Sequence, residues 1–477
     1  MRSATALALS AAALLAVPAA AGAAAYHGTV ITGENPKVAP QNKPAGYKGE
    51  PLKVIAHPIG ANSGEPTIGV DKKGAVFFPA DNFDNPDGAL AHTDLLRSTD
   101  HGRTWKNVSP MIGGQNTHTK SLDTYLYLDK DTGRTFFIDL LGGASQISRS
   151  DDEGATWSEG VGAALGVNDH ETITTGVPPA GFSAPLLDPA FPKLVYYCAN
   201  TIAEVTCARS LDGGRSFTQV NSPFPTHMAN NPPLSVLCSS LTGHLITDKD
   251  GRVYIGSSFN SPACDGRVFV AMSPDGGMTW NESTVTDKVL NAEHEVTLAA
   301  DRRGTIYATW DDSLHQLPYL AVSKDHGATW SKPIMIAPPG VHETNFPTID
   351  ASAPGHVAIG FPGSDAPKAD DPTRAWQYYM VVSADADGAN PTFVSDSPEI
   401  PGTGSRIVHR GDCTNRCGGM FDFLDIKIAP AGDGVAWGTL SDDCTGKCVK
   451  DPKGASDNPS PGLGFAVEQV AGPKLNG

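Results

Sequence analysis

The chain of 477 residues lacks any long apolar run after residue 25, so no later segment predicts a transmembrane helix. One such run lies at the start, where a single arginine precedes an alanine- and leucine-rich core from Ala4 to Val17, followed by small residues through Ala25. This order predicts a secretory signal peptide over residues 1–25. No cysteine lies near the expected cleavage point, which excludes a lipid anchor there. We expect a secreted, extracellular protein without membrane insertion.

Basic residues are scarce. The chain has 35 lysines and arginines against 52 aspartates and glutamates, and its formal net charge is −17. Acidic residues exceed basic ones along the whole chain, which argues against nucleic acid and anionic membrane surfaces as partners. We expect a monomer.

Helical periodicity is also scarce. The 51 glycines and 38 prolines separate short runs of β-forming residues, which predicts an all-β protein.

All eight cysteines lie beyond the signal peptide, which fits an oxidising compartment. Cys198 and Cys207 flank a short connection between two strand-like runs, as in a hairpin disulfide. The other six are Cys238, Cys264 and two pairs with three residues between them, Cys413/Cys417 and Cys444/Cys448. These last four could hold zinc, but their spacing and the predicted export favour disulfides. The sequence leaves the pairing open.

One eight-residue pattern recurs. It reads S-x-D-x-G-x-[T/S]-[W/F] and stands at residues 98–105, 150–157, 210–217, 273–280 and 323–330, with a stretched version from Ser383 to Phe393. Its aspartates are Asp100, Asp152, Asp212, Asp275, Asp325 and Asp385. Ser and Asp side chains bond a turn's own backbone, and glycine supplies a positive φ. One active site does not need six copies, so we interpret these aspartates as structural.

The pattern resembles the Asp box, or BNR repeat, of the sialidase-like β-propellers, here of a secreted bacterial type. The resemblance implies blades of four antiparallel strands. Six such units and a closing strand pair near residues 421–440 predict a seven-bladed β-propeller, with six blades as the alternative. We assign residues 61–477 to the propeller and residues 26–60 to an extended N-terminal arm, in which Lys53–His57 adds a strand. The superfamily contains sialidases, other glycoside hydrolases, polysaccharide lyases and structural proteins.

We expect catalytic or ligand-binding residues where the inner strand of each blade begins, beside the central channel. A His-Glu pair occupies this phase in three blades, and a carboxylate occupies it in two more. The candidate catalytic residues are therefore His170, Glu171, His294, Glu295, His342, Glu343, Glu65 and Asp123. A ring of these carboxylates and imidazoles around the channel supplies acid and base groups. It suits glycoside hydrolysis or the binding of a divalent cation such as calcium. Alternatively, these residues are capping groups inherited by duplication. The sequence requires no cofactor and assigns no metal ligand.

Long loops reach the same face and carry candidate substrate-binding residues, namely Arg374, Trp376, Tyr378, Asp311, His315 and Arg406. The sialidase signature Arg-Ile-Pro is missing, since the first inner strand begins with Glu65-Pro66-Thr67. We therefore expect a glycoside hydrolase or lyase acting on an extracellular glycan or glycoprotein at the channel mouth. A non-catalytic carbohydrate- or protein-binding propeller is the alternative, and a true exo-sialidase comes third. Whether the protein is an enzyme stays open.

Overall fold

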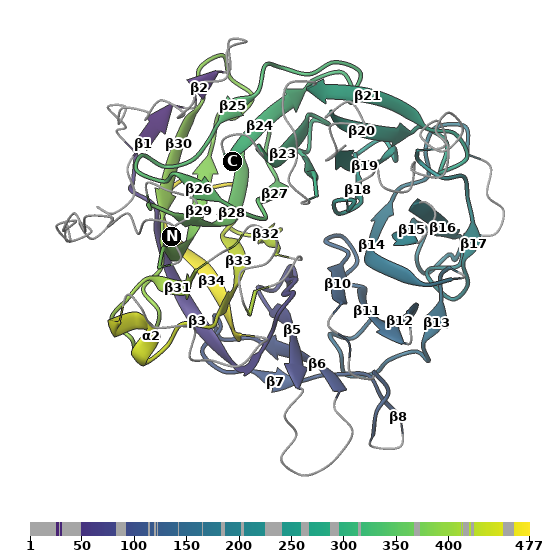
Figure 1. Cartoon of the computed structure of the whole chain (residues 1–477). Helices are drawn as coiled ribbons and strands as arrows, with labels where there is room; N and C mark the ends of the chain where they lie inside the picture. The colour runs from purple at the N-terminus through teal and green to yellow at the C-terminus, as the bar shows by residue number, and fades with distance from the viewer. Residues whose placement is uncertain are drawn as a thin grey trace, which may run out of the picture.

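Figure 1 shows a computed structural model in which blades surround a central channel. The structure describes residues 25–27, 29–30, 49–82, 92–112, 115–118, 121, 123–141, 143–164, 166–182, 187–201, 205–224, 241–258, 267–286, 295–312, 316–366, 373–411, 413, 419–420, 424–451 and 462–477. They form seven large antiparallel sheets, one per blade. The prediction of an all-β, seven-bladed propeller is confirmed.

The first four blades have four strands each. Blade 1 contains β4 (Gly69–Val70), β5 (Val76–Asn82), β6 (His92–Ser98) and β7 (Lys106–Asn107). After it comes a small hairpin of β8 (Met111–Ile112) and β9 (Gln115–Asn116). Blade 2 contains β10 (Thr124–Leu128), β11 (Thr135–Leu141), β12 (Ala144–Ser150) and β13 (Val161–Gly162). Blade 3 contains β14 (Asn168–Gly176), β15 (Leu194–Thr201), β16 (Val205–Ser210) and β17 (Thr218–Gln219). Blade 4 contains β18 (Ile246–Thr247), β19 (Val253–Ser258), β20 (Val268–Ser273) and β21 (Asn281–Thr286).

Blades 5 and 6 each gain an outer strand from the N-terminal segment. Blade 5 contains β22 (Thr297–Ala300), β23 (Ile306–Asp312), β24 (Leu317–Ser323) and β25 (Ile334–Met335), with β2 (Thr29–Val30) added beside β25. In blade 6, the short inner strands β26 (Glu343–Thr344) and β27 (Thr348–Ala351) both pair with β28 (Val357–Ser364). The sheet continues through β29 (Ala375–Ser383) and β30 (Thr392–Asp396) to β1 (Ala25–His27), and β31 (Ile407–Arg410) pairs with β29.

Blade 7 joins distant parts of the chain. Its order is β32 (Ile426–Ile428), β33 (Ala436–Asp442), β34 (Leu463–Ala471) and β3 (Lys53–Asn62), and the helix α2 (Lys447–Lys450) follows β33. The carboxylate of Glu468 on β34 is 2.9 Å from Nε2 of His57 on β3 and 2.7 Å from Nδ1 of His101 in blade 1. Strand pairing and these contacts therefore close the ring.

The apolar core is divided into seams between neighbouring blades. The largest seam contacts blades 4, 5 and 6, and further seams join each remaining neighbouring pair around the ring. The side chains of Phe77, Phe136, Tyr254, Tyr307 and Trp310 in these seams are fully buried. Burial of apolar surface between blades, rather than within one sheet, therefore holds the ring together.

The repeated turns share one hydrogen-bond pattern. In blade 1, Oδ1 of Asp100 accepts the amide of Thr104 at 2.9 Å, Oδ2 accepts its hydroxyl at 2.6 Å, and Oγ of Ser98 accepts the amide of Gly102 at 2.9 Å. The bonds from Thr104 lower the pKa of Asp100 to about 2. In the stretched sixth turn, the same role falls to the amide of Thr392, which donates to Asp385 at 2.8 Å.

These turns also contact the preceding blade. The indole N–H of Trp157 donates to the carbonyl of Val108 at 2.7 Å, and that of Trp280 donates to the carbonyl of Asn221 at 2.9 Å. Cations of one blade reach the next turn in the same way, as in the bond of 2.6 Å from Arg209 to the carbonyl of Gly276. Each turn is therefore both a local fold and a link between blades.

Two disulfides are described. Cys198 and Cys207 face each other on β15 and β16 and are bonded, which confirms the predicted hairpin disulfide. Cys444 is bonded to Cys448, and Cys413 is also disulfide-bonded. Cys238, Cys264 and Cys417 lie outside the described residues.

None of the helices within the described ranges has the length and apolarity that a membrane crossing requires.

Replacing Asp275 by alanine tests the turn. The carboxylate accepts the amide and hydroxyl of Thr279 at 2.8 and 2.7 Å, so we expect the variant to lose about 2 kcal/mol of unfolding free energy. Chemical denaturation measures this. The control is Asp250→Ala, whose carboxylate accepts the side chains of Lys249 and Arg252, and this variant should lose much less stability. Equal losses in the two variants would contradict the assigned role of the turn.

Candidate functional site

Strand pairing defines two ends of each blade. Thr124 at the start of β10 pairs with Asp139 toward the end of β11, whereas Leu128 pairs with Thr135, and Thr135 pairs with Ser150 of the repeated turn. We call the first end, where inner strands begin, the rim. The repeated turns lie at the other end, the turn face.

The predicted catalytic residues of the rim differ in exposure. Glu65, Glu171, Glu295 and Glu343 are all buried, with 1%, 0%, 2% and 3% of their surfaces exposed. His170 is also buried, whereas Asp123 and His342 are partly exposed. His294 and the predicted substrate-binding residue His315 lie outside the described residues.

Glu171 lies in a distorted part of β14. The pairing with β15 shifts register between Asp169 and Thr172, and His170 has a φ of 57°. Nδ1 of His170 donates to the carbonyl of Thr242 in blade 4 at 2.9 Å, which holds the unusual backbone. Because of this bulge, Glu171 does not follow the regular alternation of side chains between the two faces of the strand.

The environment of Glu171 makes its carboxyl a weaker acid, with a higher pKa, than an exposed glutamate has. Burial raises the pKa of its carboxyl well above the usual value, and the negative charges of Asp123, Asp169 and Asp139 raise it further. Neither carboxyl oxygen has a hydrogen-bond partner among the described residues. A carboxyl in this environment is a proton donor rather than a fixed negative charge.

Asp139, whose charge raises the pKa of Glu171, has Oδ1 3.3 Å from Nδ1 of His118, and neither Asp139 nor His118 was predicted from the sequence. Asp139 is the one charged residue in the otherwise apolar stretch Phe136–Leu140. That isolation was a readable signal. His118 lies in an irregular segment and gave no signal.

A second cluster of acidic side chains lies at the rim of blades 5 and 6. Arg374 makes a two-pronged contact with Glu343, with Nε 3.1 Å from Oε2 and NH2 3.2 Å from Oε1. Burial raises the pKa of Asp311 to about 7, against the bond of 2.8 Å from the hydroxyl of Thr344. The structure thus joins two predicted substrate-binding residues to a predicted catalytic one.

Two of the other predicted substrate-binding residues, Trp376 and Tyr378, have packing roles. Trp376 and Tyr378 are fully buried in the seam between blades 6 and 7, and the indole N–H of Trp376 donates to the carbonyl of Gly411 at 2.9 Å. Arg406 is partly exposed, with NH1 3.5 Å from Oδ1 of Asp396. Its contact lies within blade 6.

The channel has a cavity of about 620 Å³ toward the turn face. Lysines and aspartates line it, and several of them form ion pairs with each other. Nζ of Lys193 is 2.7 Å from Asp129 and 2.6 Å from Asp131, and Lys130 is 2.6 Å from Asp350 across the channel. The ion pairs connect blades 2, 3 and 6.

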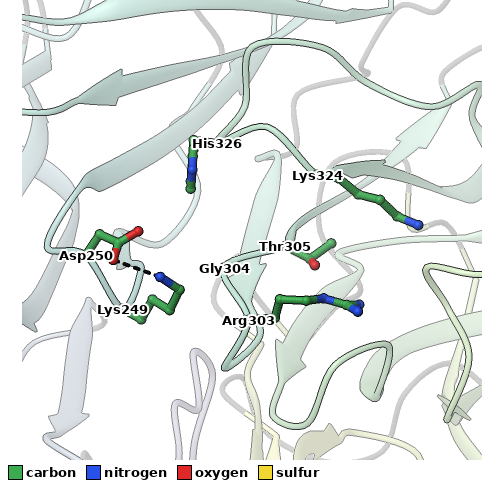
Figure 2. Close-up of a pocket in the computed structure, with 7 residues that line it drawn as sticks. All are labelled: Lys249, Asp250, Arg303, Gly304, Thr305, Lys324 and His326. Carbon is green, nitrogen blue, oxygen red and sulfur yellow. Dashed lines mark hydrogen bonds and ion pairs between the residues drawn. The ribbon is translucent and has the colours of Figure 1, made fainter.

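A hollow of about 430 Å³ on the turn face lies between blades 4 and 5 and contains Asp250 and His326 (Figure 2). With Asp248, these form a group in the described residues whose ligand atoms are close enough to hold a metal ion. NH1 of Arg252 lies 3.0, 2.9 and 3.3 Å from Asp248, Asp250 and His326. A guanidinium therefore occupies the position that a cation would take. Lys324 and Arg303 extend away from Asp250 in Figure 2.

Comparison with known proteins gives distant similarities. No known family's sequence profile matches the chain. A xyloglucanase from Paenibacillus sp. is 26% identical over 286 residues, which are 54% of this chain and 24% of that protein. The chain spans about a quarter of the length of that curated relative.

Solved structures with a similar arrangement include glycan-active proteins. The intramolecular trans-sialidase from Ruminococcus gnavus is 13% identical, with a TM-score of 0.42 and coverage of 87% of this chain and 98% of that one. The NanB sialidase from Streptococcus pneumoniae is 11% identical, with a TM-score of 0.41 and coverage of 67% and 68%. An ulvan lyase is 11% identical, with a TM-score of 0.42 and coverage of 67% and 78%. These comparisons assign no activity to the chain.

The pKa of Asp311 predicts a pH dependence of stability. Between its ordinary pKa of 3.8 and about 7, the folded chain keeps this proton and the unfolded chain releases it. The unfolding free energy therefore falls as the pH rises through this window. Asp311→Asn removes the titration and keeps an acceptor for Thr344. We expect the variant to be more stable above pH 7 by up to about 4 kcal/mol.

Denaturant titrations of both proteins at several pH values measure this difference. At pH values below about 4, the carboxyl is protonated in both states, so the two proteins should have nearly equal stability. A difference that does not change with pH would contradict the role of Asp311.

Proposed function

We propose that the protein is a secreted enzyme that hydrolyses glycosidic bonds in an extracellular glycan at the rim of blades 2 and 3. In this proposal, Glu171 is the general acid, which protonates the departing oxygen. Asp123 and Asp169, which reach solvent, contact the substrate at the entrance to the site.

The complete burial of Glu171, which together with nearby acids raises the pKa of its carboxyl, is the observation that carries the proposal. A general acid must hold its proton at the working pH, and burial beside other carboxylates achieves this. Glycoside hydrolysis needs a protonated carboxyl and a second, ionised one close by. The rim of blades 2 and 3 carries Asp123, Asp139, Asp169 and Glu171 on two strands and a loop, and the three aspartates act electrostatically on Glu171.

The charge of the site favours an uncharged glycan. Asp123, Asp169 and Asp139, which act electrostatically on Glu171, would repel an anionic sugar at this rim. The distant relative is named a xyloglucanase, which makes xyloglucan the first polysaccharide to test. Export by the predicted signal peptide is part of the proposal, and the disulfides Cys198–Cys207 and Cys444–Cys448 support an oxidising location.

A non-catalytic, glycan-binding propeller is the second candidate. Glu171 has no exposed surface in the unliganded chain. A buried, neutral carboxyl of this kind also serves as a polar part of a core, without any chemistry.

Glu171→Gln distinguishes the two candidates. Glutamine is nearly isosteric with a protonated glutamic acid, so we expect an unchanged thermal midpoint. Loss of the transferable proton should lower kcat on a cleaved polysaccharide by roughly a hundredfold or more. Reducing-end assays on xyloglucan, other neutral polysaccharides, a sialylated glycan and a uronic acid polymer, each with and without chelator, measure it.

The control is Glu153→Gln on the turn face, where the carboxylate contacts Lys73 and Arg97, and this variant should retain full activity. A wild-type protein that cleaves nothing in the panel but binds one of the glycans would establish the binding propeller instead. Full activity of Glu171→Gln would remove Glu171 from the mechanism.

A further inference from the structure

The channel cavity at the turn face has more cations than acids on its wall. Six of the seven blades each contribute one lysine or arginine, against five aspartates in all. The formal charge of the whole chain is −17, so this cavity has the opposite charge balance from the rest of the molecule. The six cations are Lys72, Lys130, Lys193, Lys249, Arg302 and Lys427.

A repeated turn at the end of the inner strand positions four of these cations. In blades 1, 2, 4 and 5, the strand is followed by an aspartate and then by the lysine or arginine that lines the cavity. The aspartate accepts amides of its own turn, as Oδ1 of Asp301 does from Arg303 and Gly304 at 2.9 Å each. The next side chain therefore starts from a fixed turn in each of these blades.

The aspartates of the wall are already engaged by donors of the protein. The carboxylate of Asp248 accepts the amide of Asp250 and the hydroxyl of Tyr254, both at 2.9 Å. The carboxylate of Asp129 accepts the amide of Thr132 at 2.7 Å. Because these bonds offset part of the negative charge, the aspartates cancel less of the positive charge of the cavity than their number indicates.

Two of the cations bond to neutral groups rather than to acids. Nζ of Lys72 donates to the carbonyl of Asp131 at 2.9 Å, and NH2 of Arg302 donates to the carbonyl of Asn476. Neither side chain forms an ion pair with a carboxylate in the part of the chain that the structure describes. Both are exposed, and they come from blades 1 and 5. A negative ligand can therefore contact them from solvent without breaking an ion pair.

The wall also has apolar parts. Leu128, Leu298 and Ile349 line the cavity and are nearly fully buried. The volume of about 620 Å³ is in the range of sites for small organic molecules. Cations on different sides of one cavity suit a ligand with more than one negative group. Phosphate and sulfate oxygens accept bonds from several lysine and arginine side chains at once.

We propose that the turn-face end of the channel binds a small organic molecule with two or more phosphate or sulfate groups, held by Lys72 and Arg302 together with the other cations of the wall. This site lies at the opposite end of the strands from the rim and does not depend on the proposed function. The acids of the rim repel an anion, so the two ends of the channel select ligands of different charge.

Isothermal titration calorimetry of the purified protein tests the proposal. The probes are pyrophosphate, a sulfated disaccharide and an uncharged disaccharide, each in about 150 mM salt. We expect at least one anionic probe to bind and the uncharged disaccharide not to bind. Binding should weaken as the salt concentration rises, because ions screen exposed cations. Tighter binding of pyrophosphate would identify a phosphorylated ligand, and tighter binding of the disaccharide a sulfated one.

The double variant Lys72→Gln with Arg302→Gln removes the two cations that bond to carbonyls. Because each loses a direct contact with the ligand, we expect the affinity for the bound anionic probe to fall about tenfold or more. Thermal unfolding checks that the variant is folded. If it is not, the two single variants decide the matter, and each should weaken binding about threefold.

The matched control is Lys73→Gln with Arg303→Gln, which changes the next residue of each of the same two turns. Lys73 contacts Glu153, and Arg303 contacts Asp387 beside the separate hollow in Figure 2. The control loses the same total charge but no cation of the cavity wall, so its affinity should stay within about twofold of wild type. Equal losses in the two double variants, equal binding of the uncharged disaccharide, or no binding of either anionic probe would overturn the proposal.

Discussion

The carboxylate of the repeated turn is the constraint on which the ring depends. It accepts hydrogen bonds from a serine, an amide and a threonine or serine of its own turn, as Asp212 does with Ser210 and Ser216. The turn thereby fixes where the outer strand begins and presents backbone carbonyls to cations of the preceding blade. The contact between each turn and the preceding blade is repeated around the ring. It sets the angle between each pair of neighbouring sheets, and these angles together enclose the channel. The positions of the rim residues are thus a consequence of turns at the opposite end of each strand.

Buried charged groups have different surroundings at the two ends of the channel. At the turn face, ion pairs join blades, as Lys130 does with Asp350 and Lys193 with Asp129 and Asp131, and these pairs add stiffness. At the rim, carboxyls from inner and second strands converge with few cations. Burial of these carboxyls raises their pKa, which makes Asp311 and Glu171 weaker acids than exposed carboxyls. One fold thus provides a rigid end and a chemically responsive end.

The fold was readable from the sequence because its determinants are local. The repeated turn occupies eight consecutive residues, and its spacing gave the blade count, so the propeller and the Cys198–Cys207 hairpin could both be predicted. The burial of Trp376 and Tyr378 was not readable, because their seam is made by two blades whose facing residues are far apart in the chain. Asp139 was overlooked since attention fell on inner strands, although its isolation among Phe136, Phe137 and Ile138 marked it. The contact with His118 depends on an irregular segment, which no periodic pattern describes.

The seventh blade has a consequence for the order of folding. β3 lies near the beginning of the chain and its partner β34 near the end, and the contact from His57 to Glu468 spans 411 residues. A growing chain presents β3 first, and that strand has no sheet to join until the last blade has been made. Six blades can assemble in sequence as their turns form, whereas closure has to wait for the whole chain. Until then both flanks of the incomplete ring expose strand edges and apolar seams, so chaperone protection is needed most in this interval.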